Sequence, residues 1–262
     1  MTNSDLISII TPFKNSSEFL NDCLESIINQ SYLNWELIII DDYSNDNSFQ
    51  LVNSISQNDK RIKLYKNDGE KGIISCLRQG LNKCSGDYIT RMDSDDVMDK
   101  DKLKELHRSL KNCGKGYVST SKVKYFSNDE LGLGYEKYEN WLNKMMIDND
   151  HFKHIYKECV IPSPNWMILK DDLLLCGGFN SNIYPEDYDL VFRFYKERFK
   201  IISSLKILHF WRDYPARTSR TDSNYADNSF LDLKIKYFME LNYDITKDLI
   251  IWGAGKRGKL LA

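Results

Sequence analysis

Residues 87–96, DYITRMDSDD, join an apolar run to three carboxylates within four positions. The first part, 87–92, is predicted to be a β-strand, and Asp93, Asp95 and Asp96 lie in the turn that follows it. Similar apolar runs precede it along the chain, at residues 6–11, 35–40 and 62–65. The segments between these runs carry apolar residues at helical spacing. Strands that alternate with helices in this way are typical of an α/β protein with a mostly parallel central sheet flanked by helices.

The pattern is less regular after residue 96. It predicts further helices near 102–112, 187–199 and 230–241, strands at 116–126 and 200–209, and an irregular stretch up to about residue 165. The tail at 248–252 resembles a strand, and a G-x-G-x-x-G runs from Gly253 to Gly258. A dinucleotide site needs a complete βαβ unit. We therefore expect residues 248–262 to be the start of a truncated Rossmann-like second domain.

Composition excludes several classes of protein. The chain has 262 residues, of which 42% are hydrophobic, and its formal net charge of −2 provides no overall field for nucleic acid. The first residues do not resemble a secretory signal, and no apolar run approaches the roughly 18 residues that span a bilayer. We expect a cytoplasmic protein with at most peripheral contact at the inner face of the cytoplasmic membrane. The six cysteines form no Cys-x-x-Cys pair, which favours reduced thiols over structural zinc.

Two acidic turns fall at the same edge of the predicted sheet. Asp41 and Asp42 follow the second strand, and Asp93 to Asp96 follow the fourth. Ligands of open α/β sheets bind at the carboxyl ends of the strands. Carboxylates so close repel one another unless a cation neutralises them, and oxygen ligands suit Mg²⁺ or Mn²⁺ held against a diphosphate. The alternative is a solvated helix N-terminus, where acidic residues favour the helix dipole.

A third acidic group lies in PEDYDL at 185–190. A carboxylate here is a candidate general base for an acceptor hydroxyl. The same helix-dipole alternative applies to these residues, because acids are common in the first turn of a helix.

Together these features resemble the family 2 inverting glycosyltransferases of the GT-A fold, over roughly residues 6 to 220. The resemblance is carried by ISIITPFKN (7–15), ELIIIDDYSNDNS (36–48), EKGIISCLRQGLNKCSGDYITRMDSDD (70–96), CGGFNSNIYPEDYDLVFRF (176–194) and LHFWRDYPARTSR (208–220). It implies a single catalytic domain at 1–220, with a nucleotide-sugar-binding half at 1–98 and an acceptor-binding half at 99–220. A C-terminal helical segment, 221–247, would follow.

The resemblance also implies roles for matching residues. On the nucleotide-sugar side these are Thr11, Pro12 and Phe13 in the nucleotide pocket, Asp42 on the base, Arg78, Asp93 near the ribose or donor sugar, and Arg212 with Arg217 and Arg220 over the pyrophosphate. Asp93 and Asp95 match an Asp-x-Asp motif, with Asp95 the direct metal ligand. Asp187 matches the catalytic base. Two positions depart from the family: Tyr43 stands where Gly is common, and Arg78 where Asn is frequent.

His209 and Trp166 each have two possible roles, and Glu186 has one expected role. His209 is a candidate additional metal ligand or a structural histidine. Trp166 is a candidate acceptor-binding residue that stacks on a sugar, or a core residue. Glu186 is expected beside the acceptor. The apolar stripe of the helix at 230–241 either packs against the catalytic domain, which we favour, or rests on a membrane.

The expected activity is metal-dependent transfer of one sugar, with Mn²⁺ or Mg²⁺ as cofactor. The donor would be a nucleotide-diphosphate sugar, with a UDP-sugar favoured, and the acceptor a saccharide or a lipid-linked saccharide. The pathway that the resemblance implies is assembly of a bacterial cell-surface polysaccharide or lipopolysaccharide. A sugar nucleotidyltransferase and a non-catalytic nucleotide-sugar-binding module are the alternatives. The first would want a glycine-rich loop after strand one, and TPFKNSS (11–17) contains no glycine.

Overall fold

The computed structural model describes residues 5–128, 131–225 and 227–251, together with residues 253, 255 and 258. Within these residues one 8-stranded sheet crosses the molecule in the order β3-β2-β1-β4-β7-β6-β8-β5. Its strands are β1 (Ile7–Phe13), β2 (Trp35–Asp41), β3 (Ile62–Lys66), β4 (Tyr88–Arg91), β5 (Val97–Met98), β6 (Tyr117–Phe126), β7 (Trp166–Leu169) and β8 (Lys200–Arg212). The first four strands pair in parallel, β6 pairs with β8 in parallel, and β7 and β5 are antiparallel to their neighbours.

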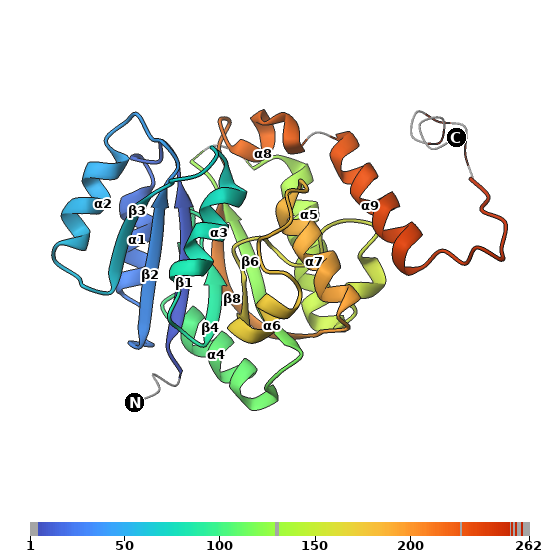
Figure 1. Cartoon of the computed structure of the whole chain (residues 1–262), viewed down its shortest axis with the longest axis horizontal. Coiled ribbons are helices and arrows are strands. Elements are labelled where there is room, and N and C mark those ends of the chain that lie inside the picture. Colours follow the sequence, from blue (N-terminus) through green and yellow to red (C-terminus); the bar gives the residue numbers. More distant parts are fainter. Residues whose placement is uncertain are drawn as a thin grey trace.

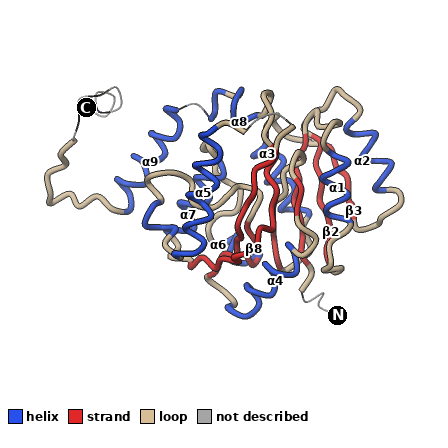
Figure 2. Tube along the Cα trace, turned by 180° about the vertical axis from the view of Figure 1, so that it is seen from behind, coloured by secondary structure: helices blue, strands red, loops and turns tan. Residues whose placement is uncertain are grey.

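Helices cover both faces of this sheet, as Figures 1 and 2 show. They are α1 (Leu20–Ile28), α2 (Ser48–Ser56), α3 (Ile73–Lys83), α4 (Lys102–Cys113), α5 (Leu133–Asp148), α6 (Lys170–Leu175), α7 (Glu186–Lys196), α8 (Thr218–Thr221) and α9 (Asp227–Leu241), with 3₁₀ turns at His151–His154 and Ser223–Tyr225. One apolar cluster lies under α1, α2 and α4, and a second under α3, α5, α6, α7 and α9. The predicted mostly parallel α/β sheet is confirmed.

The alternation of side chains along each strand explains the two clusters. In β2, Leu37 and Ile39 pack into the cluster under α1, whereas Ile38 and Ile40 pack into the cluster under α3. Successive residues of a strand point to opposite faces, so a strand covered on both sides is apolar at every position. Gly86, between α3 and β4, is required by close packing, because a Cβ there would lie 2.5 Å from the Leu6 carbonyl oxygen.

The stretch expected to be irregular contains real elements. Helix α5 carries its buried contacts through Leu142, Met145 and Met146 and otherwise shows aromatic and charged side chains. Strand β7 is only Trp166–Leu169 and lies between β4 and β6 in the middle of the sheet. Short antiparallel strands and aromatic helices give a weak periodic signal, which is why the sequence pattern did not reveal them.

The segment after residue 220 packs on the α/β domain. In α9, Leu233 and Tyr237 are buried, and the Tyr237 ring stacks on Phe192 of α7 with centroids 4.5 Å apart. Packing of the apolar stripe on the domain is therefore what the structure shows. Beyond α9 the described chain projects from the body (Figure 1).

The structure also describes part of the tail and all of the cysteines. Residues 248–251 form no strand, and Trp252 with much of the glycine motif lies outside the described residues. Across the part of the chain that is described, no helix is both long enough and apolar enough to span a bilayer. All six cysteines, each among the described residues, are free thiols, as expected.

Candidate active site

The acidic turn after β4 is fixed by contacts from distant parts of the chain. Asp96 is wholly buried, and its carboxylate accepts hydrogen bonds from His209 Nε2 at 3.1 Å and from the Arg212 backbone N–H at 2.8 Å. Asp95 accepts a hydrogen bond from the Tyr214 hydroxyl at 3.0 Å. Strand β8 and the loop after it therefore hold the carboxylates of the turn in place.

The electrostatics of this turn suit a cation. Burial and, after it, the negative charges of Asp96 and Asp93 together raise the pKa of Asp95 to about 7. Burial likewise raises the pKa of Asp96. No group of three or more His, Cys, Asp or Glu that could hold a metal ion occurs among the described residues. Magnesium-type sites use one or two carboxylates plus substrate phosphates, so this donor set fits such a metal.

His209 is bound on both sides by the protein. Its Nε2 faces Asp96, and its Nδ1 lies 3.0 Å from Nζ of Lys102, with both His209 and Lys102 wholly buried. Both ring nitrogens are therefore occupied by side chains. This geometry supports the structural role that was the alternative to metal ligation.

Arg212, Arg217 and Arg220, the three arginines of residues 208–220, differ in their surroundings. Arg212 supports the acidic turn, because its Nε donates to the Asp95 carbonyl at 2.8 Å and its Nη2 to the carboxylate of Asp22 at 2.7 Å. Arg220 forms an ion pair with Asp213 at 2.7 Å. Arg217 is only 8% exposed, and its guanidinium lies over the Trp211 ring at 4.9 Å. Of the three, Arg217 is the one that faces the cavity described next.

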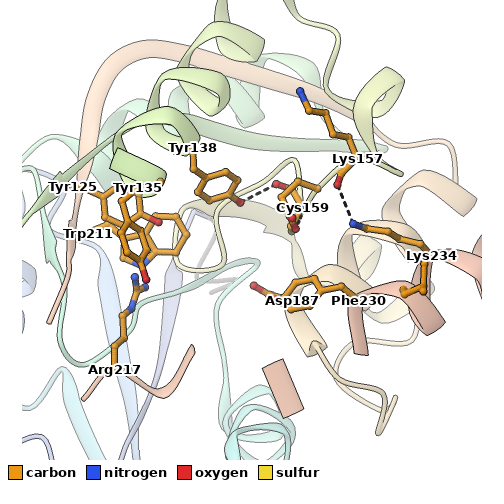
Figure 3. Close-up of a pocket in the computed structure, with 13 residues that line it drawn as sticks. Tyr125, Tyr135, Tyr138, Lys157, Cys159, Asp187, Trp211, Arg217, Phe230 and Lys234 are labelled. Carbon is orange, nitrogen blue, oxygen red and sulfur yellow. Dashed lines mark hydrogen bonds between the residues drawn. The ribbon is translucent and has the colours of Figure 1, made fainter. Parts of the chain in front are cut away.

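A cavity of about 550 Å³ is shown in Figure 3. Five aromatic side chains line it, those of Tyr125, Tyr135, Tyr138, Trp211 and Phe230, together with five charged ones, those of Lys157, Glu158, Asp187, Arg217 and Lys234. In Figure 3 the carboxylate of Asp187 points into the cavity, toward the side where Arg217 and Trp211 lie. Apolar walls combined with convergent polar groups are usual for a small-molecule site.

Asp187 has the properties of a general base. It lies in the first turn of α7, and one carboxylate oxygen accepts the Tyr188 backbone N–H at 2.8 Å. Burial and the charge of Glu186 raise its pKa to about 7, against the opposing charge of Arg91. A carboxylate with a pKa near neutrality can take a proton from a hydroxyl at physiological pH.

Glu186 lies next to Asp187 but is bound by other residues. Its Oε1 accepts from Arg91 Nη1 at 2.9 Å, and its Oε2 accepts from the Tyr225 hydroxyl at 2.7 Å. Both carboxylate oxygens are thus occupied. The structure places Glu186 in a buried network, whereas we expected it beside the acceptor.

The predicted nucleotide-binding residues lie together at the carboxyl ends of β1 and β2. Asp42 accepts hydrogen bonds from the Gly72 N–H at 3.0 Å and from Asn67 Nδ2 at 2.8 Å. The Thr11 hydroxyl is buried without a hydrogen-bond partner, and Pro12 beside it is partly exposed. A buried polar atom without a partner is a reason to expect a ligand nearby.

Two aromatic predictions need correction. Phe13 is 2% exposed and packs in the cluster under α1, so its side chain does not line a nucleotide pocket. Trp166 is also 2% exposed and packs against Phe179 and Phe194, so it is a core residue and not a surface for an acceptor sugar. The residue types phenylalanine and tryptophan alone do not show which face of a strand is buried.

Arg78 and Tyr43 depart from the family pattern and have their own contacts. Arg78 donates to the carbonyls of Phe179 and Asn180 and to the side chain of Asn182, so it fastens the loop before α7 to α3. Tyr43 takes the left-handed conformation, with φ +56°, and its hydroxyl donates to the Gly69 carbonyl at 2.8 Å. The turn therefore keeps a backbone that normally favours glycine.

Four residues of the site were not predicted: Arg91, Lys102, Tyr214 and Tyr225. Each acts through a contact with a residue that is distant in sequence, such as Arg91 with Glu186, 95 positions away. A lone arginine in a strand or a lone lysine at a helix start gives no motif. The available signal in the sequence would have been a charged residue at a position that the apolar pattern predicts to be buried.

Comparisons with known proteins point to one family. The model of the family described as Glycosyl transferase family 2 matches residues 8–174. An uncharacterized glycosyltransferase of Haemophilus influenzae is 47% identical over 111 residues, 42% of this chain and 44% of that protein. The UDP-Glc:alpha-D-GlcNAc-diphosphoundecaprenol beta-1,3-glucosyltransferase WfgD of Escherichia coli is 38% identical over 108 residues, 41% of this chain and 42% of that protein. The chain thus spans less than half the length of these two relatives.

Solved structures show the same fold. TarS of S. aureus in complex with UDP-GlcNAc superposes with a TM-score of 0.69 at 17% identity, over 92% of this chain and 68% of that one. The mannosyltransferase PcManGT of Pyrobaculum calidifontis in complex with GDP-Man and Mn²⁺ superposes with a TM-score of 0.65 at 13% identity, over 90% of this chain and 70% of that one. At these identities the likeness concerns the fold.

Proposed function

The chain belongs to glycosyl transferase family 2, and we propose that it transfers one sugar from a nucleotide-diphosphate sugar to a hydroxyl acceptor, with inversion at the anomeric carbon and with a divalent metal. The observation that carries the proposal is the placement of Asp187. Its carboxylate enters a cavity with aromatic walls that also holds Arg217, and the negative charges of the acidic turn, Asp96, Asp95 and Asp93, act on that arginine.

The proposed chemistry is a single displacement. Asp187 takes the proton of the acceptor hydroxyl while that oxygen forms a bond to the anomeric carbon of the donor sugar. The bond from the anomeric carbon to the diphosphate oxygen breaks with its electron pair, and the nucleoside diphosphate leaves from the opposite face. Arg217, a buried cation in the same cavity, is suited to the charge that develops on the diphosphate. No covalent intermediate with the enzyme is required.

Asp95 and Asp93 are the residues that would hold a divalent metal. When bound, Mn²⁺ or Mg²⁺ supplies positive charge to the leaving diphosphate. The raised pKa of Asp95 supports this assignment, since a cation relieves the repulsion among crowded carboxylates. The bound Mn²⁺ of the mannosyltransferase with the same fold is consistent with it.

The cavity and the comparisons support the proposed classes of donor and acceptor. TarS, which shares the fold, binds UDP-GlcNAc, and this supports a UDP-sugar as donor. The aromatic walls suit the apolar faces of saccharide rings. The E. coli relative, by its name, acts on a lipid-linked saccharide, which supports a saccharide or lipid-linked saccharide acceptor in cell-surface polysaccharide assembly. We place the reaction in the cytoplasm.

The proposed division of the chain follows the same site. Residues 1–98 contribute the nucleotide-sugar half and residues 99–220 the acceptor half. Phe230, Leu231 and Lys234 of α9 line the cavity, so the segment 221–247 completes the acceptor half. The proposed second domain from residue 248 lies largely outside the described residues.

The test is release of nucleoside diphosphate from a panel of UDP-, GDP- and dTDP-sugars, with Mn²⁺, Mg²⁺ or EDTA. The wild type is compared with Asp95→Asn and Asp187→Asn, and donor binding is measured by calorimetry on the same samples. Metal-dependent release from one donor, lost in both variants, supports the proposal. Absence of both release and donor binding across the panel would refute it.

A further inference from the structure

Arg91 connects the two halves of the site. It ends strand β4 and is 5% exposed. Its Nε donates to Asp93 Oδ1 at 2.8 Å, and its Nη1 donates to Glu186 Oε1 at 2.9 Å. Asp93 belongs to the acidic turn, whereas Glu186 immediately precedes Asp187 in α7. One buried guanidinium therefore bridges the donor side and the helix that carries the base.

Glu186 is held from two directions. Its second oxygen accepts the hydroxyl of Tyr225, which comes from the segment after the last strand. Glu186 itself is 7% exposed. A carboxylate bound at both oxygens cannot rotate freely, so the first turn of α7 is fixed relative to β4. Within the described residues, the hydrogen bond found for the carboxylate of Asp187, the next residue, is the local one from the Tyr188 backbone N–H.

We propose that Arg91 is a positioning residue for sugar transfer: by binding Asp93 and Glu186 together, it sets the place of Asp187 relative to the donor. This rests on the proposed function, in which Asp187 is the base. Arginine is suited to the role because its planar group presents several N–H donors in a fixed geometry. A lysine ammonium is a compact donor on a flexible stem and cannot reproduce the bridge.

The competing explanation is that Arg91 only balances buried charge. Its loss would then lower stability without changing turnover by each folded molecule. The same helix offers a matched control, because Arg193 pairs with the buried Asp189 at 2.9 Å and touches neither Asp93 nor Glu186. Arg193→Lys perturbs an ion pair of α7 without disturbing the bridge.

The experiment is a double-mutant cycle measured on kcat and donor KM, with Arg91→Met, Glu186→Gln, the double variant and Arg91→Lys. We expect Arg91→Met to lower kcat about 100-fold, the loss that a small misplacement of a catalytic group produces. Arg91→Lys should lose about 10-fold, with donor KM changed by less than about 3-fold in both. The double variant should lose no more than the worse single variant, since both changes break one bridge. Arg193→Lys should keep kcat.

Two results would overturn the proposal. One is an unchanged kcat in Arg91→Lys and Arg91→Met. The other is a loss of kcat in the double variant equal to the product of the losses in Arg91→Met and Glu186→Gln. If Arg91→Met does not fold, Arg91→Lys and the double variant, which removes one charge of each sign, carry the test.

A second readout separates this proposal from the proposed function. If the wild type neither releases nucleoside diphosphate from any donor nor binds one, the proposed function fails, and amide hydrogen exchange at 186–190 still tests the bridge. Faster exchange there in Arg91→Lys than in the wild type, with normal exchange in Arg193→Lys, supports the positioning role. Equal exchange in all three proteins rejects it.

Discussion

Nζ of Lys102 lies 3.0 Å from Nδ1 of His209, and neither side chain is exposed to solvent. An ammonium group only donates, so Nδ1 of the imidazole accepts and Nε2 carries the proton that faces Asp96. The lysine thus fixes the histidine tautomer, and the histidine in turn fixes Asp96. This buried hydrogen-bond network of Lys102, His209 and Asp96 supports the acidic turn.

Replacement of Lys102 tests the contribution of that hydrogen-bond network. Lys102→Met removes the buried donor to Nδ1 of His209 and one of the cations, beside Arg217, that act on Asp96, and we expect the free energy of unfolding to fall by about 3 kcal/mol. Mn²⁺ affinity should fall about 10-fold, as it does when partners of ligand residues are lost. Denaturant unfolding and Mn²⁺ calorimetry measure the two effects. Lys104→Met, on an exposed position of α4, is the control. A Lys102→Met protein as stable as the wild type would show that this hydrogen-bond network contributes little to stability.

The pH dependence of turnover tests Asp187. As a base it must be deprotonated, and its pKa is raised to about 7, so kcat/KM should fall about tenfold per pH unit below that value. Asp187→Asn should lower kcat by about 10³-fold and leave donor binding intact. Glu158, another carboxylate that lines the cavity, gives the control Glu158→Gln. If the acidic limb disappears in Glu158→Gln and persists in Asp187→Asn, Glu158 is the base.

Stability without metal should depend on pH through Asp95. Its folded pKa of about 7 lies above the ordinary 3.8, so between these values the native state binds more protons than the unfolded state. Stability therefore falls as pH rises through this window, and the loss is complete above pH 7. Asp95→Asn should be more stable than the wild type at pH 8 without metal, by about 1 kcal/mol. Thermal melts at pH 5 and pH 8, with and without Mn²⁺, measure this. An equal melting temperature for both proteins at pH 8 would contradict it.

The fold was predictable because its signals are local. The strands from residue 6 to 92 and the helices between them follow from the spacing of apolar residues, and the two acidic turns follow from strand ends. The contacts that build the site are not local: Arg91 meets Glu186 95 positions away, and Lys102 meets His209 107 positions away. Such pairs depend on the order of strands in the sheet, in which β7 enters between β4 and β6.

Aromatic residues were the hardest to place from the sequence. Phe13 was assigned to the nucleotide pocket through the family resemblance, and Trp166 had both an acceptor and a core alternative, but the side chains of both are buried. Residue type alone gives no information on the direction of a side chain in a strand, and that direction changes with each residue. Two of the rings that do line the cavity, Tyr135 and Tyr138, come from α5, which the sequence pattern did not reveal.

Substitution of Trp166 distinguishes a core residue from an acceptor surface. Trp166→Ala removes a large buried side chain and should lower the free energy of unfolding by about 3–5 kcal/mol. Trp166→Phe should lower it by less and leave the acceptor KM of the folded enzyme unchanged. Trp211→Phe, in the cavity wall, should instead raise the acceptor KM. A raised acceptor KM in Trp166→Phe with normal stability would restore the original assignment.

Tyr43 tests whether the left-handed turn after Asp42 is strained. A non-glycine residue at φ +56° costs on the order of 1 kcal/mol, while the Tyr43 hydroxyl gains a hydrogen bond to the Gly69 carbonyl. Tyr43→Gly removes both terms, so we expect stability within about 1 kcal/mol of the wild type. Tyr43→Ala keeps the strain and loses the bond, so it should be less stable than Tyr43→Gly by about 1 kcal/mol. Urea unfolding of the three proteins decides the matter. Equal losses in both variants would show that the bond alone matters, and that the backbone at this position is not strained.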